Sequence, residues 1–313
     1  MRFEYRPYRR SFRQPLQTSH GLWAVREGII LRLTDDVGCV GFGEVAPLSW
    51  FGSERFEDAI EFCQQLPNVI DEDTIAAIPT HLSACQFGFE SAWERLTADL
   101  TSKSKLTCSA LLPTGIAALD RWQDLWEQGY RTFKWKIGVA ELDDEIQLFE
   151  ELIQQLPLQA SLRLDANAGL NFSQAETWLQ ACDPHSNIEF LEQPLPVTQL
   201  DLMQKLGQKY STPIAIDESV ATLSQLQDCH QKGWRGIFVI KPAIVGSPFQ
   251  LRKFCQETAI DAVFSSVFET TIGQQAGLRL AAELSLKNRA VGFGISHWFD
   301  ELMEEGDRLW QSL

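Results

Sequence analysis

The chain has 313 residues, of which 44% are hydrophobic, and it carries a formal net charge of −15. That length accommodates a TIM-type barrel with one smaller domain, and the apolar fraction supplies a sizeable core. The acidic balance argues against a nucleic-acid or anionic-membrane surface, and no apolar run reaches the roughly 18 residues of a membrane span. Because no signal-peptide apolar region follows the Arg-rich start, the sequence predicts a cytoplasmic protein, with no obligate protein partner evident.

The N-terminal third has the texture of a separate α+β domain. Its predicted elements are strands at 2–8 and 27–34 and helices near 54–65 and 80–99. We interpret the Gly-Phe-Gly-Glu segment at 41–44 as a strand-to-loop turn, since two glycines alone are weak evidence for a phosphate loop. The expected domain comprises residues 1–105, with the C-terminal segment 297–313 packing back on it.

The rest of the chain repeats one unit, a short apolar run followed by a segment with helical periodicity. Ser173 and Glu176, for example, form a predicted capping box for a helix over 173–182. The runs are predicted as buried parallel strands: 107–113, 132–138, 161–167, 188–194, 213–219, 236–242, 261–267 and 290–296. Eight strands alternating with helices predict an α/β barrel over residues 106–296.

Five successive runs each end in a charged side chain, at a spacing of 24 to 29 residues. These side chains are Lys136, Asp165, Glu192, Asp217 and Lys241. Functional groups on barrels come from the C-terminal ends of strands, so we expect the five to converge on one mouth. The alternative is a set of unrelated exposed charges, but such charges would not follow the strand pitch through five units.

Three of the five are carboxylates on adjacent strands. Asp165, Glu192 and Asp217 alone at close range would repel one another and raise each other's pKa. A hard divalent cation relieves that repulsion, and an oxygen-only ligand set points to Mg²⁺, with Mn²⁺ as a possible substitute. The sequence therefore predicts a metal site with coordination positions left for substrate or water.

The lysines suggest proton transfer. Lys134 and Lys136 lie two apart and so share the inward face of one strand, while Trp135 faces the outer helices. Crowded cations beside a metal lower a lysine's pKa, which makes a general base, and Lys134 is expected to tune Lys136 electrostatically. The alternative role, counterions to the carboxylates, explains one lysine but not three. A metal facing a lysine base suits removal of a proton from the carbon next to a carboxylate, as in the enolase superfamily.

The chain resembles that superfamily over nearly its full length, in the branch that includes muconate-lactonizing enzymes, dipeptide epimerases and o-succinylbenzoate synthases. The Lys-x-Lys motif at 134–136 is similar to the family's second-strand motif, and the carboxylates and Lys241 match its metal ligands and sixth-strand lysine. This resemblance implies a modified (β/α)7β TIM barrel with an N-terminal α+β capping domain. The segments that resemble that domain are 26–28, 41–48 and 85–93, and its expected substrate-facing loops are 14–24 and 46–54.

Within the branch, the short and divergent o-succinylbenzoate synthases are the most similar. Arg163 precedes the first metal ligand by two residues, as in those enzymes, and an inward Arg must be paired or meet an anion. Residues 265–273 resemble their seventh-strand segment, which contains Ser265, favoured over its neighbour for inward contact, and Glu269. The eighth run, 290–296, lacks the Asp-x-Asp with which dipeptide epimerases hold an ammonium group. Asn167 is a candidate for orienting the metal ligands.

The implied activity is that of a hydro-lyase acting on a small-molecule carboxylate. It would dehydrate 2-succinyl-6-hydroxy-2,4-cyclohexadiene-1-carboxylate to 2-succinylbenzoate, a step towards menaquinone or phylloquinone, with Lys136 as base and Lys241 as a facing cation. One alternative is an N-succinylamino acid racemase or another epimerase or cycloisomerase of the superfamily, which shares the catalytic residues. A second is a non-catalytic metal-dependent binding barrel, which would require one of the five positions to be lost.

Overall fold

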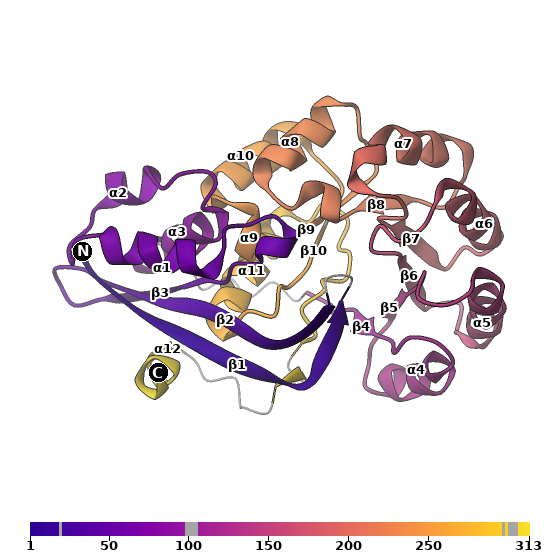
Figure 1. The fold of residues 1–313 in the computed structure, drawn as a ribbon, viewed down its shortest axis with the longest axis horizontal. Helices are drawn as coiled ribbons and strands as arrows, with labels where there is room; N and C mark the ends of the chain where they lie inside the picture. Colours follow the sequence, from indigo (N-terminus) through magenta and orange to yellow (C-terminus); the bar gives the residue numbers. More distant parts are fainter. Residues whose placement is uncertain (19–20, 98–105, 296–297, 300–305) are drawn as a thin grey trace.

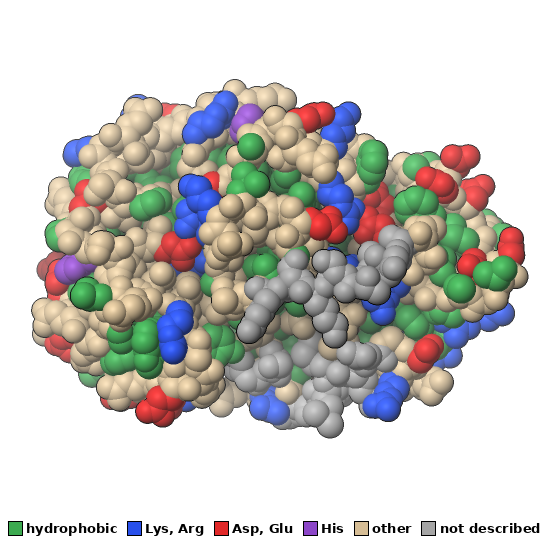
Figure 2. All heavy atoms as spheres, turned by 180° about the vertical axis from the view of Figure 1, so that it is seen from behind, with side chains coloured by type: hydrophobic (Ala, Val, Ile, Leu, Met, Phe, Trp, Pro, Cys, Tyr) green, Lys and Arg blue, Asp and Glu red, His purple; other side chains and the backbone are tan. Residues whose placement is uncertain are grey.

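The computed structural model describes residues 1–18, 21–97, 106–295, 298–299 and 306–313. An antiparallel sheet with its helices lies beside a parallel, curled sheet that is surrounded by helices (Figure 1). The predicted α/β class, a barrel with an N-terminal α+β unit, is confirmed. No described helix is long and apolar enough to cross a membrane. On the face shown in Figure 2, basic side chains are interspersed with acidic and hydrophobic ones.

The N-terminal sheet has three strands in the order β1-β2-β3. Its elements are β1 (Arg2–Thr18), β2 (Gly21–Thr34), β3 (Val40–Val45), α1 (Phe56–Gln65), α2 (Glu72–Ala76) and α3 (Ser83–Thr97). The prediction of a loop at 14–24 was wrong for most of that segment, because β1 and β2 continue as a hairpin past a register shift between Ser11 and Leu16. The outer part of the hairpin lacks the apolar alternation that identifies a strand in a sequence. The sequence pattern therefore predicted a strand end at residue 8, although β1 continues to Thr18. The 46–54 segment does lack a strand, and holds a short 3-10 helix, Ser49–Phe51.

The Gly-Phe-Gly-Glu segment lies inside β3, so its interpretation as a turn was wrong. The two glycines allow the strand to lie directly on α3. A Cβ on Gly41 would sit 2.1 Å from the Ala92 carbonyl oxygen, and one on Gly43 would sit 2.0 Å from the Gly88 carbonyl oxygen. The glycines are therefore required by close packing of the backbones. This packing fixes the orientation of the side chain of the next residue, Glu44.

The parallel sheet runs in the order β10-β9-β8-β7-β6-β5-β4. Its strands are β4 (Ala110–Leu111), β5 (Thr132–Lys136), β6 (Ser161–Asp165), β7 (Ile188–Glu192), β8 (Ile214–Ile216), β9 (Ile237–Ile240) and β10 (Ala262–Phe264). Parallel bridges from Gly292 to Ser265 and from Val291 to Cys108 join the two edges. The eighth predicted strand is thus a short bridging segment that closes the barrel, and most predicted strands are shortened where their loops begin.

Helices follow the first seven barrel strands. They are α4 (Ala117–Glu127), α5 (Leu142–Gln155), α6 (Phe172–Cys182), α7 (Leu200–Lys209), α8 (Leu223–Gln231), α9 (Pro242–Val245), α10 (Pro248–Thr258) and α11 (Thr271–Leu284). The α6 capping box is formed by Asn171 and Gln174, so the predicted pair, Ser173 and Glu176, was wrong by two residues. As predicted, Trp135 packs outward, with its ring 6.3 Å from that of Trp178 on α6.

The C-terminal helix α12 (Gly306–Ser312) lies against the N-terminal sheet (Figure 1). Trp310 is buried with Tyr8, Ile30 and Phe42, and its carbonyl oxygen accepts a hydrogen bond from Arg6. These contacts support our proposed division into a capping domain of residues 1–105, joined by part of 297–313, and a barrel of residues 106–296.

Candidate active site

The charged residues predicted at the strand ends lie in one layer at the C-terminal mouth of the barrel. Asp165 pairs in register with Lys136 on one side and with Glu192 on the other. Asp217 and Lys241 directly follow β8 and β9. Below this layer, apolar side chains fill the barrel interior: Phe190, Ala215, Ile237, Val239 and Val263. The polar layer therefore lies directly above packed apolar side chains.

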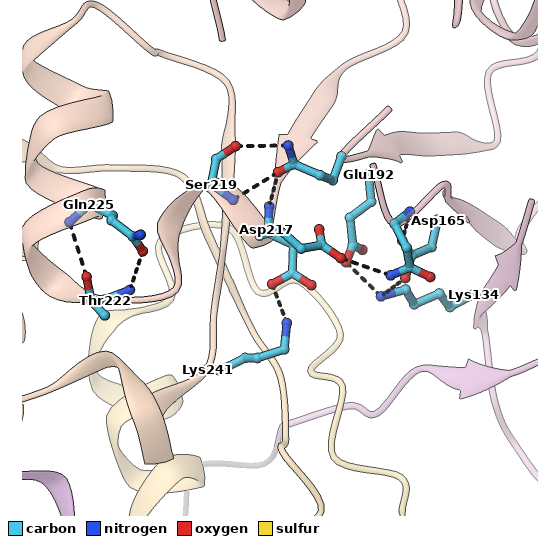
Figure 3. Close-up of polar contacts among 11 residues, drawn as sticks. Lys134, Asp165, Glu192, Asp217, Ser219, Thr222, Gln225 and Lys241 are labelled. Carbon is cyan, nitrogen blue, oxygen red and sulfur yellow. Dashed lines mark hydrogen bonds and ion pairs between the residues drawn. The ribbon is translucent and has the colours of Figure 1, made fainter. Parts of the chain in front are cut away.

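The carboxylates of this layer interact with two of the lysines (Figure 3). The Lys134 ammonium group lies 2.7 Å from Asp165 Oδ2 and 2.7 Å from Glu192 Oε1. Lys241 donates to Asp217 Oδ1. By contrast, the half-buried Lys136 ammonium group forms no hydrogen bond or ion pair with any described residue. Among the described residues, Lys136 is therefore the lysine of the layer that has no carboxylate partner.

Burial and mutual repulsion shift the pKa values of the layer. Burial, followed by the charge of Asp165, raises the pKa of Glu192 to about 8. Burial raises the pKa of Asp217 to about 6, although Lys241 opposes the shift. For Lys134 burial lowers the pKa, but the charges of Asp165 and Glu192 outweigh it and leave the pKa well above its usual range. Lys134 is therefore held as a cation between two carboxylates, and the lowered lysine pKa expected beside a bound metal stays a prediction.

The donor chemistry of the mouth fits a hard divalent cation. Asp165, Glu192 and Asp217 present only oxygen atoms, and their burial is costly without a positive charge. Within the described ranges, no three Asp, Glu, His or Cys side chains meet at metal-ligand spacing, since Lys134 and Lys241 pair with these carboxylates. A divalent cation bound by these carboxylates would lower the raised pKa values of Glu192 and Asp217.

Neighbouring polar residues hold the Asp165 carboxylate and the Asp217 backbone in place. The Asn167 backbone N–H donates to Asp165 Oδ1 at 3.0 Å, and its side chain donates to Glu218 Oε1 at 3.2 Å. Gln193, which sequence reasoning missed, is fully buried and accepts hydrogen bonds from the backbone N–H groups of Asp217 (3.0 Å) and Ser219 (3.2 Å). A fully polar side chain directly after a buried strand is the signal that could have identified Gln193.

The other predicted residues lie at different depths. Arg163 is one layer below Asp165 and pairs with Glu189, with its Nε 2.7 Å from Glu189 Oε2, so of the two possibilities for this Arg the structure shows pairing. Ser265 continues the inward alternation from Val263. Glu269 is buried, accepts a hydrogen bond from Ser266 Oγ at 2.8 Å, and has its pKa raised to about 7 by burial.

The capping domain supplies an aromatic cover over the mouth. The Phe51 ring centroid lies 4.0 Å from the Lys241 ammonium nitrogen, within the range of a cation–π contact. Trp50 packs between Phe51 and Trp23, with ring centroids 6.1 Å and 5.5 Å away. Sequence reasoning placed the 46–54 segment near the substrate, but the pairing of Phe51 with Lys241 needed the tertiary structure.

Comparison with known proteins agrees with this geometry. The Enolase C-terminal domain-like family model matches residues 117–309. The curated o-succinylbenzoate synthase of Thermosynechococcus vestitus is 39% identical, over 100% of this chain and 99% of the relative. The chain belongs to the o-succinylbenzoate synthase family of the enolase superfamily. Its predicted resemblance to that family is confirmed.

Solved structures separate this family from its neighbours in the superfamily. The crystal structure of o-succinylbenzoate synthase from Thermosynechococcus elongatus BP-1, complexed with Mg in the active site, matches with a TM-score of 0.93 and 38% identity over 100% of both chains. The L-Ala-D/L-Glu epimerase of Bacillus subtilis matches with a TM-score of 0.80 and 22% identity, over 96% of this chain and 91% of the epimerase. The epimerase therefore shares the fold, whereas the synthases also share the sequence.

Proposed function

We propose that this protein is an o-succinylbenzoate synthase. It dehydrates 2-succinyl-6-hydroxy-2,4-cyclohexadiene-1-carboxylate to 2-succinylbenzoate, a step towards menaquinone or phylloquinone, which would place it in the cytoplasm. The observation that carries the proposal is the juxtaposition of two lysines with three buried carboxylates in one layer: Lys136, which has no partner among the described residues, and Lys241, which is paired. Family membership at 39% identity over the full chain supports the choice of substrate.

Asp165, Glu192 and Asp217 would hold Mg²⁺ or Mn²⁺, and the Mg bound in the related crystal structure supports this assignment. When bound, the cation supplies Lewis-acid stabilisation of negative charge on the substrate's ring carboxylate. Asn167 and Gln193 keep the neighbourhood of these ligands rigid through their hydrogen bonds to Asp165 and Asp217. We assign Lys134 the role of setting the local charge beside Asp165 and Glu192.

Lys136 removes the proton from the ring carbon that carries the carboxylate. Its half-buried ammonium group has no partner among the described residues, so no ion pair has to break before its neutral form can act. Lys241 stays protonated and places its positive charge opposite Lys136, where it stabilises the negative charge that builds on the substrate. Its contact with Phe51 holds the ammonium group at that place.

Loss of the hydroxyl group from the adjacent ring carbon completes the reaction. Lys136 returns its proton to the departing hydroxide, so one water molecule leaves and the lysine is regenerated neutral. The remaining electron pair forms the third double bond of the aromatic ring. We assign contact with the succinyl tail to Ser265, which points inward by strand alternation, and to the aromatic cover from the cap.

An ultraviolet assay of the purified protein tests the proposal. With Mg²⁺ present, loss of the cyclohexadiene absorbance should be fast, and EDTA should abolish it. Absence of conversion by folded, metal-loaded protein would contradict the synthase assignment. Solvent-deuterium exchange into N-succinylamino acids, measured on the same sample, would then test the racemase alternative.

A further inference from the structure

A buried carboxylate of the capping domain contacts the start of a barrel helix. Glu44 ends the Gly-Phe-Gly-Glu segment of β3 and is fully buried. Its Oε1 accepts a hydrogen bond from the Tyr8 hydroxyl at 2.5 Å, and its two oxygens lie 2.9 and 3.0 Å from the Thr270 backbone nitrogen. Oε2 also accepts from the Gly273 backbone N–H at 2.9 Å and from the Thr270 hydroxyl.

The Thr270 and Gly273 donors belong to the start of α11, for which Thr270 is the N-cap. A carboxylate at this position satisfies N–H groups that have no partner within the helix and is stabilised by the helix dipole. Gly273 admits the carboxylate closely, because a Cβ at that position would lie 2.9 Å from Glu44 Oε2. Glu44 therefore ties the capping sheet to a barrel helix at its start.

The segment that connects β10 to α11 ends at this helix start. In that segment Ser265 follows the interior residue Val263 by two positions and so points inward by strand alternation. Ser266 Oγ and the Val267 backbone N–H donate to Glu269 at 2.8 and 2.7 Å. Phe268 has a left-handed backbone conformation, with φ of 64°, and its ring packs edge-on against capping-domain rings. Those rings are Phe12 and Trp23, with centroids 5.3 and 5.5 Å from that of Phe268. A left-handed Phe persists only where its surroundings hold it.

We propose that Glu44 is a positioning residue that locks the capping domain onto α11 and thereby holds Ser265 and Phe268 in place for substrate binding. This inference rests on the proposed function, because the substrate is assigned there. Glu44, Tyr8, Thr270 and Gly273 together form what we call the cap latch. Opening the latch lowers substrate affinity and leaves the lysine and carboxylate layer intact.

Steady-state kinetics of matched variants test the latch. Glu44→Gln keeps the shape but turns one acceptor oxygen into an N–H₂ donor that faces other donors. We expect KM to rise about tenfold while kcat falls less than about threefold. Thr270→Val should also raise KM. Thr270→Ser keeps the hydroxyl and should have the wild-type KM.

The control is Asp183→Asn, at the opposite end of the barrel. Asp183 accepts hydrogen bonds from the Thr212 backbone N–H (2.8 Å), the Thr212 hydroxyl (2.7 Å) and the Ser211 backbone N–H (3.1 Å), a donor set like that of Glu44. This variant should lower the thermal midpoint without raising KM. The proposal is overturned if Glu44→Gln raises KM no more than Asp183→Asn does, or if Thr270→Val and Thr270→Ser behave alike. Should Glu44→Gln fail to fold, Thr270→Val and Tyr8→Phe make the same comparison.

Hydrogen–deuterium exchange tests the latch without any substrate. Amides of residues 265–273 should exchange faster in Glu44→Gln than in wild-type protein or Asp183→Asn. Unchanged exchange in that segment would overturn the proposal. Because this measurement does not depend on turnover, it decides the latch even if the wild-type protein proves inactive on the cyclohexadiene carboxylate, which would contradict the proposed function alone.

Discussion

The two ends of the barrel each carry a cluster of acidic and basic side chains, but the clusters are balanced differently. At the N-terminal end, which we call the base cluster, Arg163, Glu189, Asp261, Lys287 and Arg289 are joined by ion pairs of 2.7 to 2.9 Å. Burial raises the pKa of Glu189, but Arg163 and Arg289 outweigh it and hold the pKa below its usual value. At the mouth, by contrast, the pKa of Glu192 is raised to about 8. Each carboxylate of the base cluster pairs with two cations, whereas at the mouth Asp165 and Glu192 share Lys134, so burial dominates the pKa of Glu192, as it does at many binding sites.

Replacing the proposed base should have the largest effect on activity. Lys136→Ala removes the group that takes the α-proton, so kcat should fall at least about a thousandfold. Because the Lys136 ammonium group has no described partner, the thermal midpoint and Mg²⁺ binding should change little. Circular dichroism and a metal titration serve as controls. Near-normal turnover by a folded variant would contradict the assignment of the base.

Neutralising one carboxylate at each end compares the two clusters directly. Outer-shell partners of a metal are worth about 10- to 100-fold in affinity or activity, so loss of a ligand in Glu192→Gln should lower activity at least about a hundredfold. It should also weaken the rise of the thermal midpoint on adding Mg²⁺. Glu189→Gln, in the base cluster, should keep the wild-type response to Mg²⁺. Equal responses in the two variants would show that the mouth carboxylates are not the metal site.

Removing an ion pair from the base cluster, at the N-terminal end of the barrel, should lower the stability of the fold more than the catalytic rate. Arg163 is 2% exposed and pairs with Glu189, so Arg163→Met leaves a buried carboxylate with fewer partners. We expect the free energy of unfolding, measured in urea, to fall by about 3 kcal/mol while kcat is nearly unchanged. Lys205→Met, which removes an exposed pair with Asp201, should cost much less. A large loss of kcat in Arg163→Met would place this Arg in the substrate site instead.

The base cluster should also give the smallest predicted effect, a dependence of stability on acid pH. Glu189 and Asp261 have folded pKa values below their unfolded ones, since their Arg and Lys partners outweigh burial. Their contribution is therefore present above an unfolded pKa of about 4 and is lost as pH falls through the lower folded values. Urea unfolding between neutral and acid pH should show this loss, about 1 kcal/mol smaller in Glu189→Gln. A steeper acid loss in the variant would contradict this account.

The sequence predicted those features that depend on local periodicity. The strand pitch placed Lys136, Asp165 and Glu192 in one layer, because parallel strands in register bring their C-terminal ends together. Local pattern failed where several residues could serve one role, as at the start of α6, where Asn171 rather than Ser173 is the N-cap. It also failed for the long β1–β2 hairpin, whose outer half lacks an apolar alternation.

Contacts between remote segments were beyond sequence reasoning. Glu44 and Thr270 are 226 positions apart, and nothing in either local sequence indicates that they meet. The same holds for Phe51 and Lys241, which come from different domains. Such contacts depend on how the capping domain packs on the barrel, and this packing follows from the shape of whole surfaces. The roles assigned to the site residues stay predictions that the variants above test.

Single-turnover kinetics with substrate deuterated at the ring carbon next to the carboxylate would test the central claim most directly. If Lys136 takes that proton at the mouth, the wild-type protein should convert the deuterated substrate clearly more slowly than the protonated one, and Lys136→Ala should convert neither. Equal rates for the two substrates, together with turnover by Lys136→Ala, would contradict proton abstraction by this lysine.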